Sequence, residues 1–287
     1  SQNKTNHLAL LNDDMKNAFI LLIILTLGFS ALSQRENFRS RSALGIMLGG
    51  SYYIGDLNPY KHFQNTHLSG GLIYRYYINS RIELRGTLMY GKVSASDANA
   101  ASEYDQLRNL SFESSIYEIS GGIEFNYKNY KLGDTKYYFT PYMFIGLGVT
   151  RINPSREYNG EKVELQPLGT EGQGSSLNDK DPYSLTQIVV PLGVGFKINF
   201  GERSAVSFEY GIRKTFTDYL DDVGGNYVDP VALTAENGNL AARMADPSLG
   251  GYEAVGPRGN SATNDWYSMF GITLTFPLGK ESTCYYR

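Results

Sequence analysis

The chain has 287 residues, with 26 Lys and Arg, 29 Asp and Glu, one Cys and a net charge of −3. No basic surplus is available to neutralise phosphates, which excludes a general nucleic-acid binder, and one cysteine excludes a disulfide framework or a cysteine-cluster zinc site. The 23 Tyr and 31 Gly, with only 19% charged residues, indicate an all-β protein of the kind that crosses membranes with strands, whereas a mean hydropathy of −0.32 excludes a bundle of transmembrane helices.

The first part of the chain is expected to direct export. A lysine at position 16 precedes an apolar run from Ala18 to Phe29, which ends in the small-x-small cleavage pattern Ala31-Leu32-Ser33. A run of about 12 residues is too short to span roughly 30 Å of hydrocarbon, so we prefer a signal peptide to a signal anchor or a buried helix. We expect residues 1–14 to be an over-extended reading frame, 15–33 a cleaved signal peptide, and Gln34 the mature N-terminus.

From Ala43 onwards, apolar residues alternate with polar or small ones in eight segments. In an extended chain, alternate side chains point to one side, so each segment has one apolar face. The eight apolar rows run from Leu44 to Ile54, Leu68 to Ile78, Ile82 to Tyr90, Tyr117 to Tyr127, Met143 to Val149, Ile188 to Phe200, Val206 to Ile212 and Phe270 to Phe276.

The opposite face of these segments carries charges in mid-strand, such as Arg75, Glu124 and Lys197. A soluble β-sandwich, with its apolar face inward, is the alternative to a transmembrane barrel, in which lipid lies outside and the lumen is polar. The expected strands have about 10–14 residues and exceed the ~5–6 of soluble sheets. Aromatic residues near the strand ends match the interfacial girdles of membrane barrels; they are Tyr52, Tyr90, Tyr127 and Trp266. Both features favour the barrel.

The connections alternate strictly between short and long. The short ones lie near residues 79–81, 128–136 and 201–203, and the long ones near 55–66, 93–113, 152–184 and 217–265. In outer-membrane barrels the short turns are periplasmic and the long loops extracellular, and an even strand number places both ends in the periplasm. The sequence therefore predicts an eight-stranded antiparallel transmembrane β-barrel over residues 42–279, with periplasmic segments at 34–41 and 280–287.

Eight strands leave an interior that side chains just fill. Four positive and four negative residues are expected to face it, and they can pair in a structural charge network: Arg75, Glu83, Arg85, Glu118, Glu124, Lys197, Glu209 and Arg213. We expect a plugged lumen, with a proton or ion path as the alternative.

Catalytic signals are weak. His62 and His67 lie around the first long connection, and a pairing with Asp56 would be one route to a hydrolase. No nucleophile signature accompanies them, so we interpret both as solvated loop histidines. We expect no catalytic residue, no cofactor and no metal site, and we assign no role to Cys284.

Asp218, Asp221 and Asp222 follow the seventh segment, and Asp229 comes seven residues later. Clustered carboxylates beside glycines bind Ca²⁺ in some loops, but this spacing does not match an EF-hand. We interpret these residues as caps and turn residues of a solvated extracellular loop, with Ca²⁺ binding as the alternative.

Residues 208–223 read Phe-Glu-Tyr-Gly-Ile-Arg-Lys-Thr-Phe-Thr-Asp-Tyr-Leu-Asp-Asp-Val. This stretch resembles a strand and loop of the Bacteroidetes outer-membrane β-barrel family that includes the type IX secretion system protein PorG. The strand starts Ala43-Leu44-Gly45-Ile46 and Phe139-Thr140-Pro141-Tyr142 resemble it too. The family-motif segment consists of Thr217, Asp218, Tyr219, Leu220, Asp221 and Asp222.

The resemblance implies a non-enzymatic outer-membrane component of the type IX protein secretion apparatus, which also supports gliding motility in gliding bacteria. The implied partners are outer-membrane lipids and the periplasmic ring, made of a PorK-like lipoprotein and a PorN-like protein. The alternatives are another structural or adhesive role, a small-solute channel, and an outer-membrane enzyme that uses His62 or His67.

Overall fold

The computed structural model describes residues 40–250 and 254–278. The expected signal peptide, its expected cleavage before Gln34, the expected periplasmic tail at 280–287 and Cys284 lie outside these ranges. Eight long strands dominate the fold: β1 (Ser42–Ile54), β2 (His67–Tyr77), β3 (Ile82–Ser96), β4 (Ser111–Asn126), β5 (Phe139–Arg151), β8 (Thr186–Asn199), β9 (Ala205–Thr215) and β10 (Trp266–Leu278).

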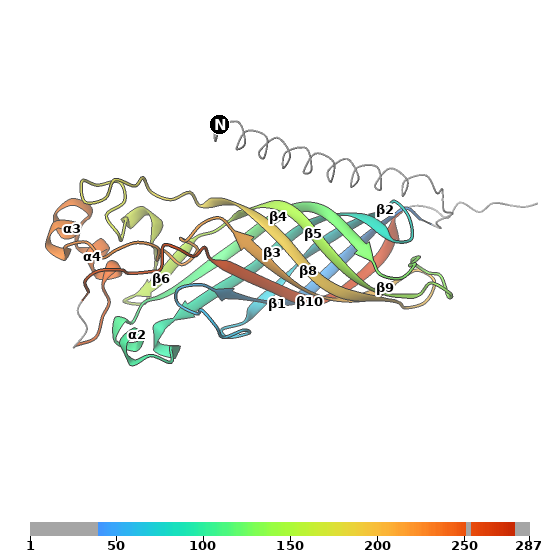
Figure 1. The fold of residues 1–287 in the computed structure, drawn as a ribbon, viewed down its shortest axis with the longest axis horizontal. Helices are drawn as coiled ribbons and strands as arrows, with labels where there is room; N and C mark the ends of the chain where they lie inside the picture. Colours follow the sequence, from blue (N-terminus) through green and yellow to red (C-terminus); the bar gives the residue numbers. More distant parts are fainter. Residues whose placement is uncertain (1–39, 251–253, 279–287) are drawn as a thin grey trace, which may run out of the picture.

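These strands form one closed antiparallel barrel (Figure 1). Each strand pairs with its neighbours in the chain, β1 pairs with β10 in the register Leu48↔Ile272, and β3 pairs with β4 in the register Leu88↔Ile119. Every long strand therefore pairs with two other long strands, and the barrel has no open edge. The predicted eight-stranded antiparallel barrel is confirmed.

The facing of the strands is inverted relative to a soluble protein. Leu48, Ile119 and Leu147 on the outer wall are 64%, 60% and 63% exposed, whereas the inward Arg75 and Lys197 are 1% and 2% exposed. In water this arrangement would expose apolar surface and bury charge; in a membrane, lipid covers the apolar wall. Of the two architectures that the alternation permits, the transmembrane barrel is the observed one.

One predicted row departs from this pattern. Tyr52 lies in the outward row of β1 but is fully buried. The first long loop folds back onto the outer wall, where His62 Nδ1 lies 3.0 Å from the Tyr52 hydroxyl and the Phe63 ring packs 5.0 Å from the Tyr52 ring. The Tyr52 hydroxyl also bonds to that of Tyr210 at 2.6 Å. Tyr52 is thus covered by protein and does not stand free in an interfacial girdle.

The two ends of the barrel differ, as predicted from the connection lengths. At the turn end, residues 78–81, 127–138 and 200–204 connect the strands, and at the loop end residues 55–66, 97–110, 152–185 and 216–265 do so. The loop end lies at the left of Figure 1 and the turn end at the right. The second long loop is shorter than predicted, because β3 and β4 stay paired up to Ser96↔Ser111.

The long loops form a packed cap over the loop end. The cap contains the hairpin of β6 (Pro154–Tyr158) and β7 (Glu161–Glu164) and the helices η1 (Asp97–Asn99), α2 (Glu103–Arg108), η2 (Gln166–Leu168), α3 (Pro230–Asn237) and α4 (Asn239–Ala245). Leu57, Leu110, Leu165 and Leu220, one from each loop, are buried in one core with Val189 and Met269 of the barrel. No helix in the described ranges is long and apolar enough to span a membrane.

Candidate functional site

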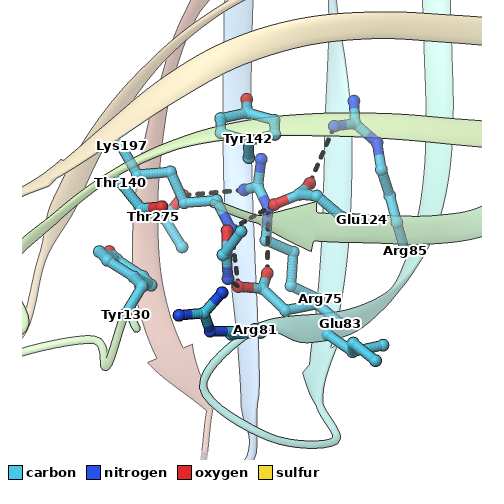
Figure 2. Close-up of polar contacts among 12 residues, drawn as sticks. Arg75, Arg81, Glu83, Arg85, Glu124, Tyr130, Thr140, Tyr142, Lys197 and Thr275 are labelled. Carbon is cyan, nitrogen blue, oxygen red and sulfur yellow. Dashed lines mark hydrogen bonds and ion pairs between the residues drawn. The ribbon is translucent and has the colours of Figure 1, made fainter. Parts of the chain in front are cut away.

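The eight charged residues that the sequence places on the inward face lie inside the barrel in two groups. The larger group, nearer the turn end, contains Arg75 of β2, Glu83 and Arg85 of β3, Glu124 of β4 and Lys197 of β8 (Figure 2), together with Glu209 of β9. The smaller group contains Glu118 of β4 and Arg213 of β9. Strand alternation explains the shared facing, since these residues all occupy inward positions of their strands.

Glu124 is the centre of the larger group. Its carboxylate accepts hydrogen bonds from Arg75 Nε at 3.2 Å and from Arg85 Nη1 at 3.1 Å, and it pairs with the Lys197 ammonium. The Glu83 carboxylate accepts a hydrogen bond from Lys197 Nζ at 2.7 Å. Figure 2 shows these side chains pointing toward one another across the lumen. A carboxylate in this position is neutralised by three cations, each of which has a further acidic neighbour.

Glu209 extends the network around the barrel wall. Arg85 forms a two-pronged contact with it, from Nη1 to Oε2 at 3.0 Å and from Nη2 to Oε1 at 2.6 Å, and the Tyr142 hydroxyl donates to Oε2 at 2.9 Å. The Arg85 guanidinium also lies 4.1 Å from the centre of the Phe144 ring. Bidentate geometry and an aromatic face hold the guanidinium in one orientation.

The smaller group closes the lumen nearer the loop end. Arg213 Nε donates to Glu118 at 3.2 Å, the Tyr267 hydroxyl donates to the same oxygen at 2.8 Å, and Arg213 Nη1 donates to the Gly211 carbonyl at 2.8 Å. A cavity that touches both Arg85 and Arg213 measures about 10 Å³, which is room for about one water molecule. Within the described ranges, the interior is therefore filled by paired charges and aromatic rings.

The family-motif segment lies at the loop end and is not a solvated loop. Leu220, Asp221 and Asp222 are at most 1% exposed. Our interpretation of Asp221 and Asp222 as solvated turn residues is wrong, because the neighbouring loops fold over them. Asp229 does act as a cap: its carboxylate accepts the Ala232 amide at 2.8 Å at the start of α3.

The Tyr53 hydroxyl hydrogen-bonds to both Asp221 and Asp265, which lie near opposite ends of the last long loop. The Tyr53 hydroxyl lies 2.6 Å from Asp221 Oδ2 and 2.7 Å from Asp265 Oδ1, and all three side chains are buried. A phenol has one proton to donate, so the second carboxyl must itself be protonated to hydrogen-bond with the phenolic oxygen. Burial first, and then the neighbouring acids, raise the pKa of Asp221 well above its usual range; burial raises the pKa of Asp265 to about 8.

Asp218 adds a further acid to this region. Its two carboxyl oxygens are shielded from solvent and have no hydrogen-bond partner. Burial, followed by the charges of Asp265, Asp56 and Glu171, raises the pKa of Asp218 to about 8. We name Tyr53, Asp56, Asp218, Asp221 and Asp265 the acid cluster.

Asp222, the last residue of the family-motif segment, forms an ion pair with Arg258. Asp222 accepts hydrogen bonds from the Thr170 hydroxyl at 2.6 Å and the Tyr183 hydroxyl at 2.7 Å, and its carboxylate lies 3.5 Å from Arg258 Nη2. Arg258 also pairs with Glu171 at 3.1 Å. Burial raises the pKa of Asp222 to about 6 although Arg258 opposes the shift. The motif therefore joins the third and fourth loops.

Tyr219 and Thr217 complete the motif. The Tyr219 ring stacks on Tyr183 at 4.8 Å, and its hydroxyl donates to Glu171 at 3.1 Å. The Thr217 carbonyl accepts the Asp265 amide at 3.0 Å. Sequence reasoning missed Tyr53, Glu171, Arg258 and Asp265 as partners of this segment.

The histidines are not assembled into a catalytic triad. His67 is the first residue of β2, and its Nε2 lies 2.7 Å from Ser94 Oγ; His62 bonds to Tyr52. Asp56 instead accepts the Asn260 amide at 2.8 Å. The interpretation of both histidines as solvated loop residues is wrong for His67, which lies half-buried in a strand. Among residues 40–250 and 254–278, no group of three His, Cys, Asp or Glu residues is arranged to hold a metal ion.

A closed eight-stranded barrel with an apolar outer wall and a charged interior defines the class: a β-barrel of the outer-membrane type. Within that class, the chain belongs to the family described as a domain of unknown function (DUF6089), whose model matches residues 16–243. No curated protein matches the chain in sequence.

Solved structures similar to this chain include three outer-membrane barrels. Neisserial surface protein A is 11% identical, with a TM-score of 0.41, and covers 83% of this chain and 98% of its own. The attachment invasion locus protein Ail of Yersinia pestis is 14% identical, with a TM-score of 0.37, over 83% and 99%. The outer membrane protein OprG of Pseudomonas aeruginosa is 11% identical, with a TM-score of 0.37, over 84% and 100%.

Proposed function

We propose that this chain is a non-enzymatic, integral outer-membrane component of the type IX protein secretion apparatus and that it anchors the periplasmic ring. The observation that carries the proposal is the filled lumen, in which the single carboxylate of Glu124 contacts three cations, Arg75, Arg85 and Lys197. A barrel closed in this way makes a poor conduit and a stable anchor. The resemblance of residues 217–222 to the PorG-containing family supplies the apparatus and the partners, a PorK-like lipoprotein and a PorN-like protein.

The turn end is the surface that we assign to the ring. Its connections are held together: the Tyr130 amide donates to the Ser80 carbonyl at 2.9 Å, and the Tyr130 hydroxyl donates to Asn199 at 2.6 Å. Gly133 has a φ of 76°, and an added Cβ would lie 2.0 Å from the Glu202 carbonyl oxygen. Only glycine permits so close an approach of the second and third turns. A rigid face of this kind suits docking, because little conformational freedom is lost on binding.

The first experiment deletes the gene in its host. We expect secretion of proteins with C-terminal sorting signals to fall sharply, together with gliding where the organism glides, and affinity purification from gently solubilised membranes to recover a ring lipoprotein. Normal secretion in the deletion strain and a purification without ring components would refute the proposal.

A complementation series locates the contact. Lys131→Glu with Arg203→Glu changes the turn end, and Lys61→Glu with Lys180→Glu makes the same charge change at the loop end. Both variants should reach the membrane, and only the first should lose the ring lipoprotein. Equal retention in both variants would remove the turn end from consideration.

An adhesive role is the second candidate, and the packed cap favours it. The four loops share a buried core, and a hollow of about 230 Å³ lies at the first two of them, lined by residues such as Tyr60, Gln64 and Asp105. An ordered cap presents a defined surface to a ligand outside the cell. Loss of attachment to host or matrix surfaces in the deletion strain, with secretion intact, would favour this candidate. A small-solute channel is tested by conductance, as set out in the Discussion.

A further inference from the structure

The turn end carries a second feature, a basic hollow that the docking proposal does not use. Its volume is about 570 Å³, and its lining includes the cations Arg81, Lys128 and Lys136 and the aromatic residues Tyr127, Tyr138 and Phe139. We name it the basic pocket. Its lining comes from the first two turns, residues 78–81 and 127–138, and from Phe139, the first residue of β5.

Each of the three cations contacts an asparagine side chain or an aromatic ring. Arg81 Nε donates to Asn129 Oδ1 at 3.0 Å, Lys128 Nζ lies 5.4 Å from the centre of the Phe139 ring, and Lys136 Nζ lies 5.3 Å from that of Tyr137. Within the part of the chain that the structure describes, none of the three cations forms an ion pair. Three positive charges therefore converge on one hollow without local compensation.

The nearest acid of the turn has other bonds. One carboxylate oxygen of Asp134 accepts the backbone amides of Lys136 and Tyr137 at 2.7 and 3.0 Å. These two hydrogen bonds shape the turn around Asp134. The charge of the basic pocket is thus complementary to an anion.

The position of the pocket selects the source of that anion. Tyr127 continues the outward row of β4 after Phe125, and Phe139 begins the outward row of β5 that leads to Met143. Tyr127 is 69% exposed. Exposed aromatic side chains at the end of a lipid-facing row mark the membrane–water interface, which is the depth of lipid phosphates.

We infer that the basic pocket binds the headgroup of an anionic phospholipid from the leaflet at the turn end, with the phosphate among Arg81, Lys128 and Lys136 and an acyl chain along the wall beside Tyr127 and Phe139. A soluble anion would need no aromatic wall facing lipid. An acidic protein would approach along the turn tips from the aqueous side, whereas the lining of this hollow includes Tyr127 and Phe139, which end the outward rows of β4 and β5. Basic pockets at membrane surfaces recognise headgroups by the same combination of charge and depth.

The test is native mass spectrometry of the full chain, released from detergent with phosphatidylglycerol or with phosphatidylcholine of the same acyl chains. We expect one phosphatidylglycerol to be retained with a dissociation constant at least about tenfold lower than that of phosphatidylcholine. The variant Arg81→Gln/Lys128→Gln/Lys136→Gln should lose this preference, because each interfacial cation contributes about fivefold in affinity. Lys128→Arg should keep it.

The matched control is Lys61→Gln/Lys162→Gln/Lys180→Gln, which removes three charges from the loop end and should bind like the unmodified chain. Folding of each variant is checked by heat-modifiable gel mobility. Equal retention of the two lipids by the unmodified chain, or equal losses in the two triple variants, would overturn the inference. Displacement of phosphatidylglycerol by glycerol phosphate at lipid-like concentrations would also overturn it. The same holds if the pocket variant loses binding of a polyglutamate peptide but still binds phosphatidylglycerol.

Discussion

The lumen and the loop end both bury several carboxyl groups, but they compensate them in different ways. In the lumen, four acids face four bases, and Glu124 contacts three of the bases. In the acid cluster, Asp56, Asp218, Asp221 and Asp265 have no base among them, and Tyr53 bridges two of the acids. The lumen is neutral because opposite charges pair, whereas the acid cluster is neutral only while it holds protons.

This difference separates two kinds of stability. Paired charges keep their interaction over the whole physiological pH range, and removing one partner leaves an uncompensated charge in a dry interior. Protonated carboxyls lose their hydrogen bonds when they ionise, so their contribution depends on pH. The packing of the cap therefore depends on pH through Asp218 and Asp265 of the acid cluster.

Breaking the lumen network should have the largest effect. Glu124→Gln removes the charge on which Arg75, Arg85 and Lys197 converge, and we expect a loss of about 3–5 kcal/mol in the free energy of unfolding. Urea titration in lipid vesicles measures it. The matched control is Glu113→Gln, because Glu113 pairs with Lys92 and Lys162 at the surface, and each exposed pair contributes only about 0–1 kcal/mol. Equal losses would show that the lumen pairs are no stronger than surface pairs.

The outer wall gives the next effect. Phe196 faces lipid and the adjacent Lys197 faces the lumen, so Phe196→Arg places a charge in hydrocarbon. Because Phe196 lies three residues from the turn end of β8, the cost should fall between the about 2–4 kcal/mol of a charge at the bilayer midplane and the about 0–1 kcal/mol of one at the interface. Lys197→Arg keeps the lumen charge and is the control. The same titration measures both, and a harmless Phe196→Arg would invalidate the facing of β8.

The acid cluster predicts a smaller effect that depends on pH. Because the pKa values of Asp218 and Asp265 are raised to about 8, the folded cap binds more protons than the unfolded chain between about pH 4 and 8. Its stabilisation is complete below about pH 4 and is lost as the pH rises through about 8. We expect the hydrogen-exchange protection factor of the Leu220 amide, which donates to Asp265 at 3.0 Å, to fall about tenfold between pH 6 and 9.

Two variants check this assignment. Asp265→Asn should flatten the dependence of the protection factor on pH, since an amide does not titrate. Asp179→Asn, on the exposed part of the third loop, should leave the dependence unchanged. A pH profile that Asp265→Asn does not alter would assign the titration to another group.

The same contrast explains what the sequence could predict. Arg75 and Glu124 occur in strands with period-two alternation, so their common facing follows from the pattern, and closure of the barrel brings them together. Tyr53, Asp221 and Asp265 come from two loop boundaries that no periodicity relates. A loop aspartate is typical of a solvated turn, and only the packing of all four loops shows that Asp221 is buried. The burial of Tyr52 was not predicted for the same reason, because a loop covers its side chain.

Conductance is the measurement for which we expect no signal, and it compares the two regions most directly. In a planar bilayer the protein should pass no steady current at neutral pH, because the groups around Glu124 and Arg213 fill the lumen. At pH 9 Asp218 and Asp265 of the acid cluster ionise and the cap loosens, yet the current should stay at zero, because the lumen is filled by a separate set of paired charges. Stable, ion-selective openings at neutral pH would refute the anchor model and favour a channel. Openings that appear only at pH 9 and vanish in Asp265→Asn would show that the cap, and not the lumen network, seals the barrel.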